Sequence, residues 1–339
     1  MNWREVPIEQ AVGQPLAYDL TEVVPGRRKG AVLRRGHLVQ QADLETLRRI
    51  GKSCVQVLEL EAGEVHEDEA AMRLARSLAG PGLEVILPGE AWADVRATQT
   101  GLLKVDAASL LQVNSVGELL VASRQDNSPV KKGELVAKAK VLGLAVKEER
   151  LEFAARLAAS HLVLKVLPFR SLGAGLVITG REVYEGLVED AFAPLIRDRL
   201  QEYGSYVAQL EVVPDEAEKV ATAIRTMLGR GADLVLVTGG MSPDDSTPEG
   251  IRRSGAEVAF YGVPVSPGAM TLLAYAAEVP VVGIPAGLLA RPRGFLDLLL
   301  PRLLAGERLG PGDVARYGHG GLCWACEACV FPACPFGKG

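Results

Sequence analysis

The sequence predicts an α/β protein in which a mainly parallel, doubly wound sheet follows a mixed α+β, β-rich N-terminal half. Two observations predict this fold class. From residue 171 onward, short apolar runs alternate with helical stripes, as in parallel sheets covered by helices on both faces. Between residues 71 and 170, short β-favouring runs alternate with turn residues instead. We therefore expect four parts: an N-terminal segment (1–70), a β-rich middle module (71–170), an α/β domain (171–310) and a Cys-rich tail (311–339).

Size and composition exclude several classes of protein. The 339 residues, 48% hydrophobic and 23% charged, suffice for about two or three globular domains. With 37 Lys and Arg against 42 Asp and Glu, the net charge of −5 excludes a generally basic protein that coats nucleic acid. The apolar stretch 279–290 is interrupted by prolines and glycines and is shorter than the ~20 residues of a membrane helix. The N-terminus resembles no secretory signal, so we expect a cytoplasmic protein with neither nucleic-acid nor membrane partners.

In the first half, apolar spacing predicts helices between short strands. One helix lies near 43–51, with Leu44, Leu47 and Ile50 on one face, and another lies over 67–79. A third helix, over 147–159, closes the middle module. The β-favouring runs are 31–33, 55–60, 84–87, 101–105, 118–123 and 134–146.

In the second half, apolar runs and helical stripes alternate regularly. The runs predict strands at 176–179, 206–213, 234–238, 258–263 and 280–284. The stripes predict helices at 192–200, 217–228, 249–253 and 295–304. Before the third helix, Thr247 is the expected N-cap and Pro248 the first helical residue. Because ligands bind beyond the carboxyl ends of strands in open α/β sheets, the residues after each strand are the first candidates for a site.

The loops after the first and third of these strands combine glycines with hydroxyl side chains. The residues are Thr179, Gly180, Thr238, Gly239, Gly240 and Ser242. Glycines let backbone N–H groups approach an anion closely, and hydroxyls add donors. These loops therefore predict a phosphate-binding site, although glycine at a strand end is also ordinary turn chemistry.

Three acids stand at neighbouring strand ends. Glu182 follows the first strand, Asp215 the second, and Asp245 lies in the loop after the third. Carboxylates beside a phosphate repel it unless a cation lies between them. Mg²⁺ prefers one or two carboxylates together with phosphate oxygens, so we expect Mg²⁺ here. The alternative is that Asp215 only caps a helix and that Glu182 is a surface acid.

The sequence around these residues resembles the molybdopterin-binding domain. The resemblance lies in Ile-Thr-Gly-Arg-Glu-Val (178–183), Val-Pro-Asp-Glu (213–216) and Thr-Gly-Gly-Met-Ser-Pro-Asp-Asp-Ser-Thr-Pro-Glu (238–249), and it covers about 172–310. Molybdopterin adenylyltransferases and molybdopterin molybdenumtransferases (molybdenum insertases) share that domain. Residues 11–20 are also similar to the opening of the insertases.

This resemblance implies a role for each candidate. The three acids would surround the place where molybdate is delivered, in a Mg²⁺-dependent step that inserts molybdenum into adenylylated molybdopterin and releases AMP. The loop glycines and hydroxyls would bind the pterin phosphate and the nucleotide, and Ser266, Pro267 and Gly268 stand where the insertases carry a Pro-Gly turn. The resemblance also implies a homo-oligomer, with a molybdoenzyme or another cofactor-pathway protein as partner.

Two other functions stay open. The insertase signature Met-Asp-Gly-Tyr-Ala is absent, and residues 113–118 occupy roughly its place. A non-catalytic molybdopterin-binding carrier or redox sensor is therefore an alternative, and it would have no need of the Mg²⁺-binding acids. A molybdopterin adenylyltransferase would fit the Asp-x-Thr-Pro element but would leave the N-terminal half unexplained.

The cysteines are concentrated in the tail. Only Cys54 lies before residue 323, whereas Cys323, Cys326, Cys329 and Cys334 follow in the pattern Cys-x₂-Cys-x₂-Cys-x₄-Cys. Such a compact set predicts a metal site rather than a disulfide framework. Zinc sites usually combine two Cys pairs across a longer loop, and the bacterial ferredoxin run is one residue shorter than this one. A [4Fe–4S] cluster and Zn²⁺ both stay open, and we favour the cluster.

Overall fold

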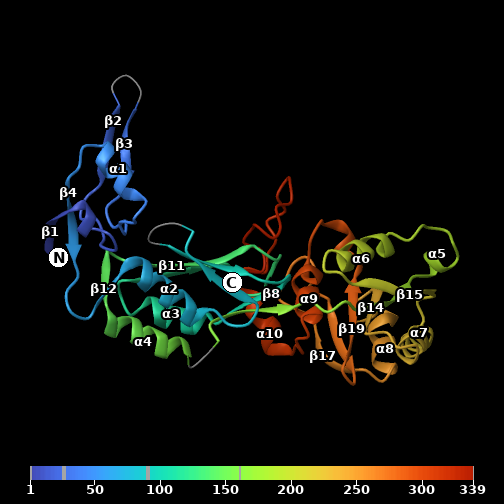
Figure 1. Ribbon diagram of the computed structural model, residues 1–339. Coiled ribbons are helices and arrows are strands. Elements are labelled where there is room, and N and C mark those ends of the chain that lie inside the picture. The colour runs from blue at the N-terminus through green and yellow to red at the C-terminus, as the bar shows by residue number, and fades with distance from the viewer. Residues whose placement is uncertain (1, 25–27, 89–91, 160–161, 339) are drawn as a thin grey trace. The chain divides into compact units, whose positions relative to one another are not determined.

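The computed structural model describes residues 2–24, 28–88, 92–159 and 162–338. The described residues divide into two compact units, those within 1–126 and 130–166 and those within 127–129 and 167–339. Figure 1 shows the first unit mainly in blue to green and the second mainly in yellow to red. This division is coarser than the four expected parts, whose boundaries stay a prediction.

The N-terminal part of the first unit contains two antiparallel strand pairs and a short helix. Its elements are β1 (Asn2–Pro7), η1 (Ile8–Gln10), β2 (Leu20–Val24), β3 (Arg28–Leu33), α1 (Asp43–Arg49) and β4 (Cys54–Glu59). β1 pairs with β4, and β2 pairs with β3. Val55 and Val57 of β4 are buried together with Leu47 of α1. Alternate residues of the strand and one face of the helix therefore form a small core.

Residues 64–168 form the β-rich region that the sequence predicts. The elements are β5 (Glu64–His66), α2 (Glu67–Leu78), β6 (Leu83–Ile86), β7 (Ala93–Ala97), β8 (Gly101–Val105), α3 (Ala107–Asn114), β9 (Leu119–Ser123), β10 (Ser128–Val130), β11 (Leu135–Val141), β12 (Ala145–Lys147), α4 (Glu148–Ala159) and β13 (Leu164–Pro168). Four strands form an antiparallel sheet in the order β6-β7-β11-β9, and β8 lies between β10 and β13 in another sheet. β5 pairs with β12. Leu74 and Leu78 of α2 are buried with Val95 and Val141, so this helix supplies much of the core beside the four-stranded sheet.

The middle region agrees with the sequence in kind but not in every element. The run 134–146 is two strands rather than one, because Gly143 takes a left-handed φ of 96° and interrupts the extended chain. The sequence does not predict β7 or α3. Asp106 caps α3, accepting hydrogen bonds from Ala108 N and Ser109 N at 3.1 Å. A cap of this kind is a helix-start signal that the apolar spacing alone does not carry.

The second unit is built on one six-stranded sheet. Its strands are β14 (Gly173–Thr179), β15 (Tyr206–Val213), β16 (Leu234–Gly239), β17 (Glu257–Tyr261), β18 (Leu272–Ala276) and β19 (Val279–Pro285). Their order is β15-β14-β16-β19-β18-β17. In this order, β15, β14, β16 and β19 pair in parallel with their neighbours, and β18 runs antiparallel to both β19 and β17. The expected α/β class and mainly parallel sheet are confirmed, with β18 as the strand that the sequence does not predict.

Helices cover both faces of this sheet (Figure 1). They are α5 (Arg181–Tyr184), α6 (Phe192–Gln201), α7 (Ala217–Gly229), α8 (Ser246–Arg253), η2 (Ala286–Ala290) and α9 (Phe295–Leu304). Ile178 of β14 is buried with Ile196 of α6 and Leu299 of α9, whereas the next-door Val177 is buried with Ile224 of α7. Successive strand residues point to opposite faces, so one strand supplies two cores and is fixed from both sides.

The C-terminal tail is part of the second unit. After α10 (Pro311–Ala315) and η3 (Arg316–Gly318), the chain continues without helix or strand to residue 338. Phe336 is only 3% exposed and belongs to the same core as Phe295 and Tyr317. Within the described residues, none of the helices is long and apolar enough to cross a membrane.

Candidate functional site

A pocket of about 510 Å³ lies at the carboxyl ends of the parallel strands. We call it the strand-end pocket. Six of the residues that the sequence marks line it: Thr179, Gly180, Glu182, Asp215, Gly239 and Gly240. They come from the ends of β14, β15 and β16, which are neighbours in the sheet. Because the strands are parallel, these ends meet at one edge, which is where ligands bind in open α/β sheets.

A chain of buried hydroxyls connects the three strand ends. Thr179 Oγ1 donates to Thr238 O at 2.9 Å and lies 3.1 Å from Thr247 Oγ1. Thr247 in turn donates to Asp215 Oδ1 at 3.5 Å. Thr247 is fully buried, and its hydroxyl lies between a threonine on β14 and an acid after β15. These hydrogen bonds hold the Asp215 carboxylate in place at the wall of the pocket.

The Asp245 carboxylate lies directly behind Gly240. Its Oδ2 accepts a hydrogen bond from Ser242 N at 2.6 Å, and a Cβ atom added to Gly240 would lie 2.5 Å from its Cγ. Only a glycine leaves room for the carboxylate at this place. Asp245 is also the N-cap residue of α8, although its side chain makes no capping hydrogen bond. Its carboxylate is held by the loop after β16.

The expected helix start, with Thr247 as N-cap and Pro248 as first helical residue, is wrong by two residues. α8 begins at Ser246, so Thr247 lies within its first turn. The side chain of Thr247 points to Asp215 and Thr179 instead of capping the helix. Tertiary hydrogen bonds therefore decide its orientation, and no local pattern encodes them.

The three acids influence one another. Burial raises the pKa of Asp215 above its ordinary value, and the negative charges of Asp245 and Glu182 raise it further, while the Thr247 hydrogen bond lowers it. Glu182 also lies against Gly180, since a Cβ atom there would be 3.2 Å from Glu182 Oε1. The pocket therefore concentrates negative charge, which favours a cation among these side chains.

Metal-ligand geometry sets a limit on this inference. In the described ranges, no group of three or more His, Cys, Asp or Glu side chains is arranged to hold a metal ion by itself. Mg²⁺ commonly takes only one or two carboxylates and completes its shell with phosphate oxygens and water. A cation at this place would therefore need phosphate or water oxygens in addition to one or two of these carboxylates.

Several lining residues escape the sequence reasoning. Arg181 lies at the start of α5, with Nη2 3.6 Å from Glu216 Oε1, and brings a positive charge to the same wall as Glu182. Asp190 accepts hydrogen bonds from Phe192 N and Ala193 N at 2.8 Å and so caps α6 beside the pocket. Arg181 stands next to Glu182 in the Thr-Gly-Arg-Glu motif, which is the signal that could identify it.

Six other candidates do not line the pocket: Thr238, Ser242, Asp245, Ser266, Pro267 and Gly268. Thr238 is fully buried, and its Oγ1 has no hydrogen-bond partner within the described residues. The turn 266–268 contacts the tail and the start of α9. Ser266 N donates to Gly321 O at 2.9 Å, and Pro267 O accepts from Phe295 N at 3.0 Å. A Cβ atom on Gly268 would lie 2.7 Å from Phe295 Cβ, so close packing explains this glycine. A ligand role for the turn stays a prediction.

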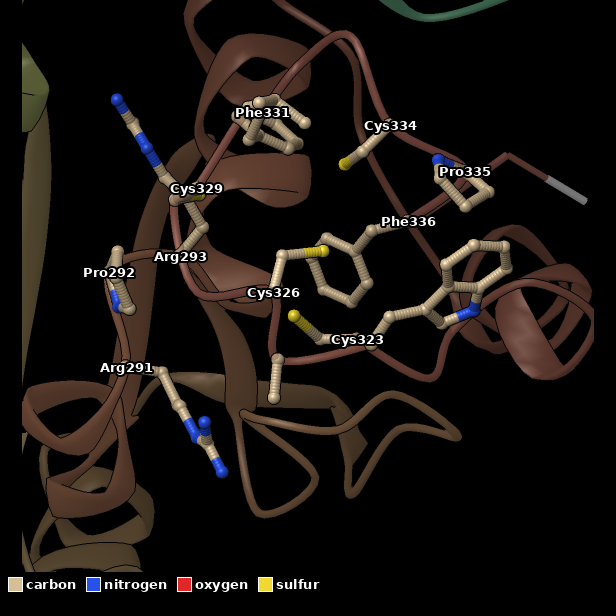
Figure 2. A pocket seen from close by; sticks show the side chains of 13 residues that line it. Arg291, Pro292, Arg293, Cys323, Cys326, Cys329, Phe331, Cys334, Pro335 and Phe336 are labelled. Carbon is tan, nitrogen blue, oxygen red and sulfur yellow. The ribbon is translucent and has the colours of Figure 1, made fainter.

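The four tail cysteines line a second, small pocket of about 50 Å³ (Figure 2). The residues Arg291, Arg293, Trp324, Phe331 and Phe336 line it as well. All four thiols are free, and so is that of Cys54 in the first unit. The sequence therefore identifies the tail residues that share this pocket, while the occupant of the pocket stays a prediction.

Comparison with known proteins identifies the domain but not the whole chain. Residues 175–305 match the family described as a probable molybdopterin binding domain, and residues 5–59 match a domain of unknown function. The molybdopterin-binding domain expected from the sequence is confirmed over 175–305.

The curated relatives match only a short part of this chain, and the solved structures match with low sequence identity and low TM-scores. A CinA-like protein of Mycobacterium avium (strain 104) is 39% identical over 85 residues, which are 24% of this chain and 20% of that protein. The chain thus spans about a fifth of the length of the curated relatives that it matches. The molybdopterin biosynthesis MoeA protein of Pyrococcus horikosii has 17% identity, with 90% of this chain and 75% of that chain covered and a TM-score of 0.35. The molybdopterin biosynthesis enzyme MoaB of Thermus thermophilus has 21% identity, with 40% and 98% covered and a TM-score of 0.32.

Proposed function

Because residues 175–305 carry a molybdopterin-binding domain, we propose that the chain acts in molybdenum cofactor biosynthesis and that its strand-end pocket binds adenylylated molybdopterin. The reaction proposed is the Mg²⁺-dependent insertion of molybdenum from molybdate, with release of AMP. One observation carries the proposal. Glu182 and Asp215 line the pocket together with the backbone of Gly239 and Gly240, and the charge of Asp245 acts on Asp215 from beside it.

The glycines would bind the phosphate of the ligand. Gly239 has a φ of 145°, which side chains rarely adopt, and a Cβ atom there would collide with Thr179 Oγ1. Backbone N–H groups at Gly239 and Gly240 can therefore approach an anion without a side chain between them. Arg181 contributes a positive charge to the lining of the same pocket.

The acids would hold Mg²⁺ against the phosphate oxygens. The raised pKa of Asp215 reflects, beside its burial, a repulsion that a divalent cation relieves. Asp245 is fixed by Ser242 N and Asp215 by Thr247, so two of the three carboxylates are already oriented. When bound, Mg²⁺ would neutralise the negative charge that develops on the phosphate as AMP leaves. The protein's contribution is to position these carboxylates and the ligand relative to each other.

A single reaction tests the proposal. The purified chain is incubated with adenylylated molybdopterin, molybdate and Mg²⁺, and AMP is quantified by chromatography. We expect AMP release that stops when either Mg²⁺ or molybdate is omitted. Asp245→Asn should abolish the release, whereas Asp244→Asn, an exposed neighbour with the same charge change, should retain it.

Two outcomes would contradict the proposal in different ways. Tight binding of the adenylylated ligand without AMP release would refute the catalytic role and favour a carrier. AMP release by Asp245→Asn at the rate of the unaltered chain would place the reaction at other residues.

A further inference from the structure

The four tail cysteines share one pocket although they span twelve positions of irregular chain. Cys323, Cys326, Cys329 and Cys334 all line the small pocket described above. Figure 2 shows the thiols of Cys323, Cys326 and Cys334 pointing toward the space beside the Phe336 ring. The fold therefore brings these side chains to one pocket, although within the described residues the four thiols are not yet close enough to form a metal-ligand group.

The tail is anchored on both sides of the cysteines. Before them, Cys323 N donates to Ser266 O at 2.9 Å, next to a short bridge between Ser266 and Leu322. After them, Phe336 is buried in the core of the second unit, and Gly337 N donates to Gly320 O at 2.9 Å. Residues 320 and 337 thus lie together, and the segment between them forms a closed loop. A closed loop restricts the distances among its thiols before any ligand binds.

The surroundings of the thiols suit a negatively charged metal centre. Arg291 and Arg293 line the same pocket, and the guanidinium of Arg293 lies 5.4 Å from the centre of the Phe331 ring. Four thiolates around a [4Fe–4S]²⁺ core leave a net charge of about −2, which the charge of Arg291 would offset, whereas Arg293 is already paired with Glu202 and Asp297. Phe331 and Phe336 also line the pocket, while Cys326 and Cys329 are exposed, so a cluster bound here would be partly accessible to solvent.

We propose that Cys323, Cys326, Cys329 and Cys334 together ligate one [4Fe–4S] cluster. A [4Fe–4S]²⁺ core delivered preformed by a cluster donor exchanges the donor's ligands for the four thiolates; each thiol loses its proton to solvent and binds one iron, so no atom changes its oxidation state. Three ligands within seven residues favour a cluster over the paired cysteines that zinc sites typically use. The proposal does not depend on the function proposed for the strand-end pocket.

The position of the cluster site suggests a physical link to the ligand pocket. Cys329 and Phe331 also line a larger hollow of about 580 Å³, together with Leu289. Leu289 lines the strand-end pocket as well. Residues 289–293 line this larger hollow; three of them (291–293) also line the cysteine pocket, and Leu289 also lines the strand-end pocket.

Metal analysis of the full chain tests the proposal. The protein is purified without oxygen, and iron, acid-labile sulfide and zinc are quantified. We expect about four iron and four sulfide per chain and a brown colour that fades in air. Cys326→Ser and Cys329→Ser change exposed ligands that do not pack in the core, and each should lose at least half of the iron. Cys54→Ser is the matched control, an exposed thiol in the first unit, and should keep the full content.

Alkylation provides a readout that does not need the variants to fold. With the cluster bound, iodoacetamide should modify Cys54 but not the four tail thiols. After a chelator and an oxidant remove the iron and a thiol reductant restores the released cysteines, all five cysteines should react. One zinc per chain, or a metal-free chain after anaerobic reconstitution with iron and sulfide, would overturn the proposal. So would tail thiols that react equally in both states.

Discussion

Replacing Gly240 by alanine should displace the Asp245 carboxylate without removing it, so this variant tests whether the position of the carboxylate matters. Gly240 is not among the glycines with a positive φ, so alanine is compatible with its backbone. The added Cβ would nevertheless lie 2.5 Å from Asp245 Cγ and 2.6 and 2.7 Å from the two carboxylate oxygens. Ordinary contact begins near 3.4 Å, so the carboxylate must move by roughly 0.9 Å.

That movement breaks the 2.6 Å hydrogen bond from Ser242 N to Asp245 Oδ2. A hydrogen bond to a charged group contributes about 1.5–3 kcal/mol, and because Ser242 is exposed we expect a loss of folding free energy of about 1.5 kcal/mol. Misplacing a metal-holding carboxylate by this distance should weaken Mg²⁺-dependent ligand binding roughly tenfold. It should slow AMP release by up to about 100-fold.

Thermal unfolding and a titration with adenylylated molybdopterin at saturating Mg²⁺ measure the two effects. Gly287→Ala is the control, because Gly287 follows β19 at the same edge of the sheet and a Cβ there meets no atom within 4 Å. We expect the control to bind like the unaltered chain. Unchanged affinity and unchanged AMP release in Gly240→Ala would refute the role given to the position of Asp245.

Three further changes test other parts of the site and the tail. Asp215→Asn should raise the unfolding free energy of the ligand-free protein near neutral pH, because the raised folded-state pKa of Asp215 means that its charged form destabilises the fold. Urea unfolding should show that this gain disappears below pH 3.8, the ordinary pKa of the carboxyl group. A gain that does not depend on pH would contradict this reasoning. Asp245→Asn should lower the pKa of Asp215, because it removes a neighbouring negative charge. An NMR titration that finds the pKa of Asp215 unchanged would show that the two carboxylates do not interact. Phe336→Ala should lower the unfolding free energy by about 3–5 kcal/mol and make the tail sensitive to limited proteolysis, because Phe336 is buried. Trp324→Ala should leave the tail protected, because the Trp324 side chain is 73% exposed. Equal cleavage of both variants would argue against Phe336 as the anchor of the tail.

The sequence predicts the parallel core of the second unit well because both faces of those strands are buried. Runs such as 234–238 carry apolar residues at nearly every position, and the intervening helices have clear stripes. β18 escapes prediction because its turn into β19 contains no glycine or asparagine. Ala277 takes the left-handed conformation there, with a φ of 52°. Local turn chemistry therefore gives no signal for this hairpin.

The sequence predicts the parts of the candidate site that the strand topology brings together, but not the parts that depend on side-chain packing. Parallel strands bring Asp215, Glu182 and Gly239 to one edge of the sheet, whatever the conformation of the segments that connect the strands. The buried hydroxyl of Thr247 joins Asp215 to Thr179 through contacts 32 and 68 positions apart, which no local spacing encodes. The turn 266–268 packs against the tail for a similar reason, since its partners at Phe295 and Gly321 are distant in sequence.

The most direct measurement is a crystal structure of the chain with adenylylated molybdopterin and Mg²⁺. The account predicts ligand density in the strand-end pocket, with a phosphate against the backbone of Gly239 and Gly240 and a cation between it and Asp215 or Asp245. Density instead in the hollow lined by Arg199 and Arg293, with the strand-end pocket empty, would contradict it.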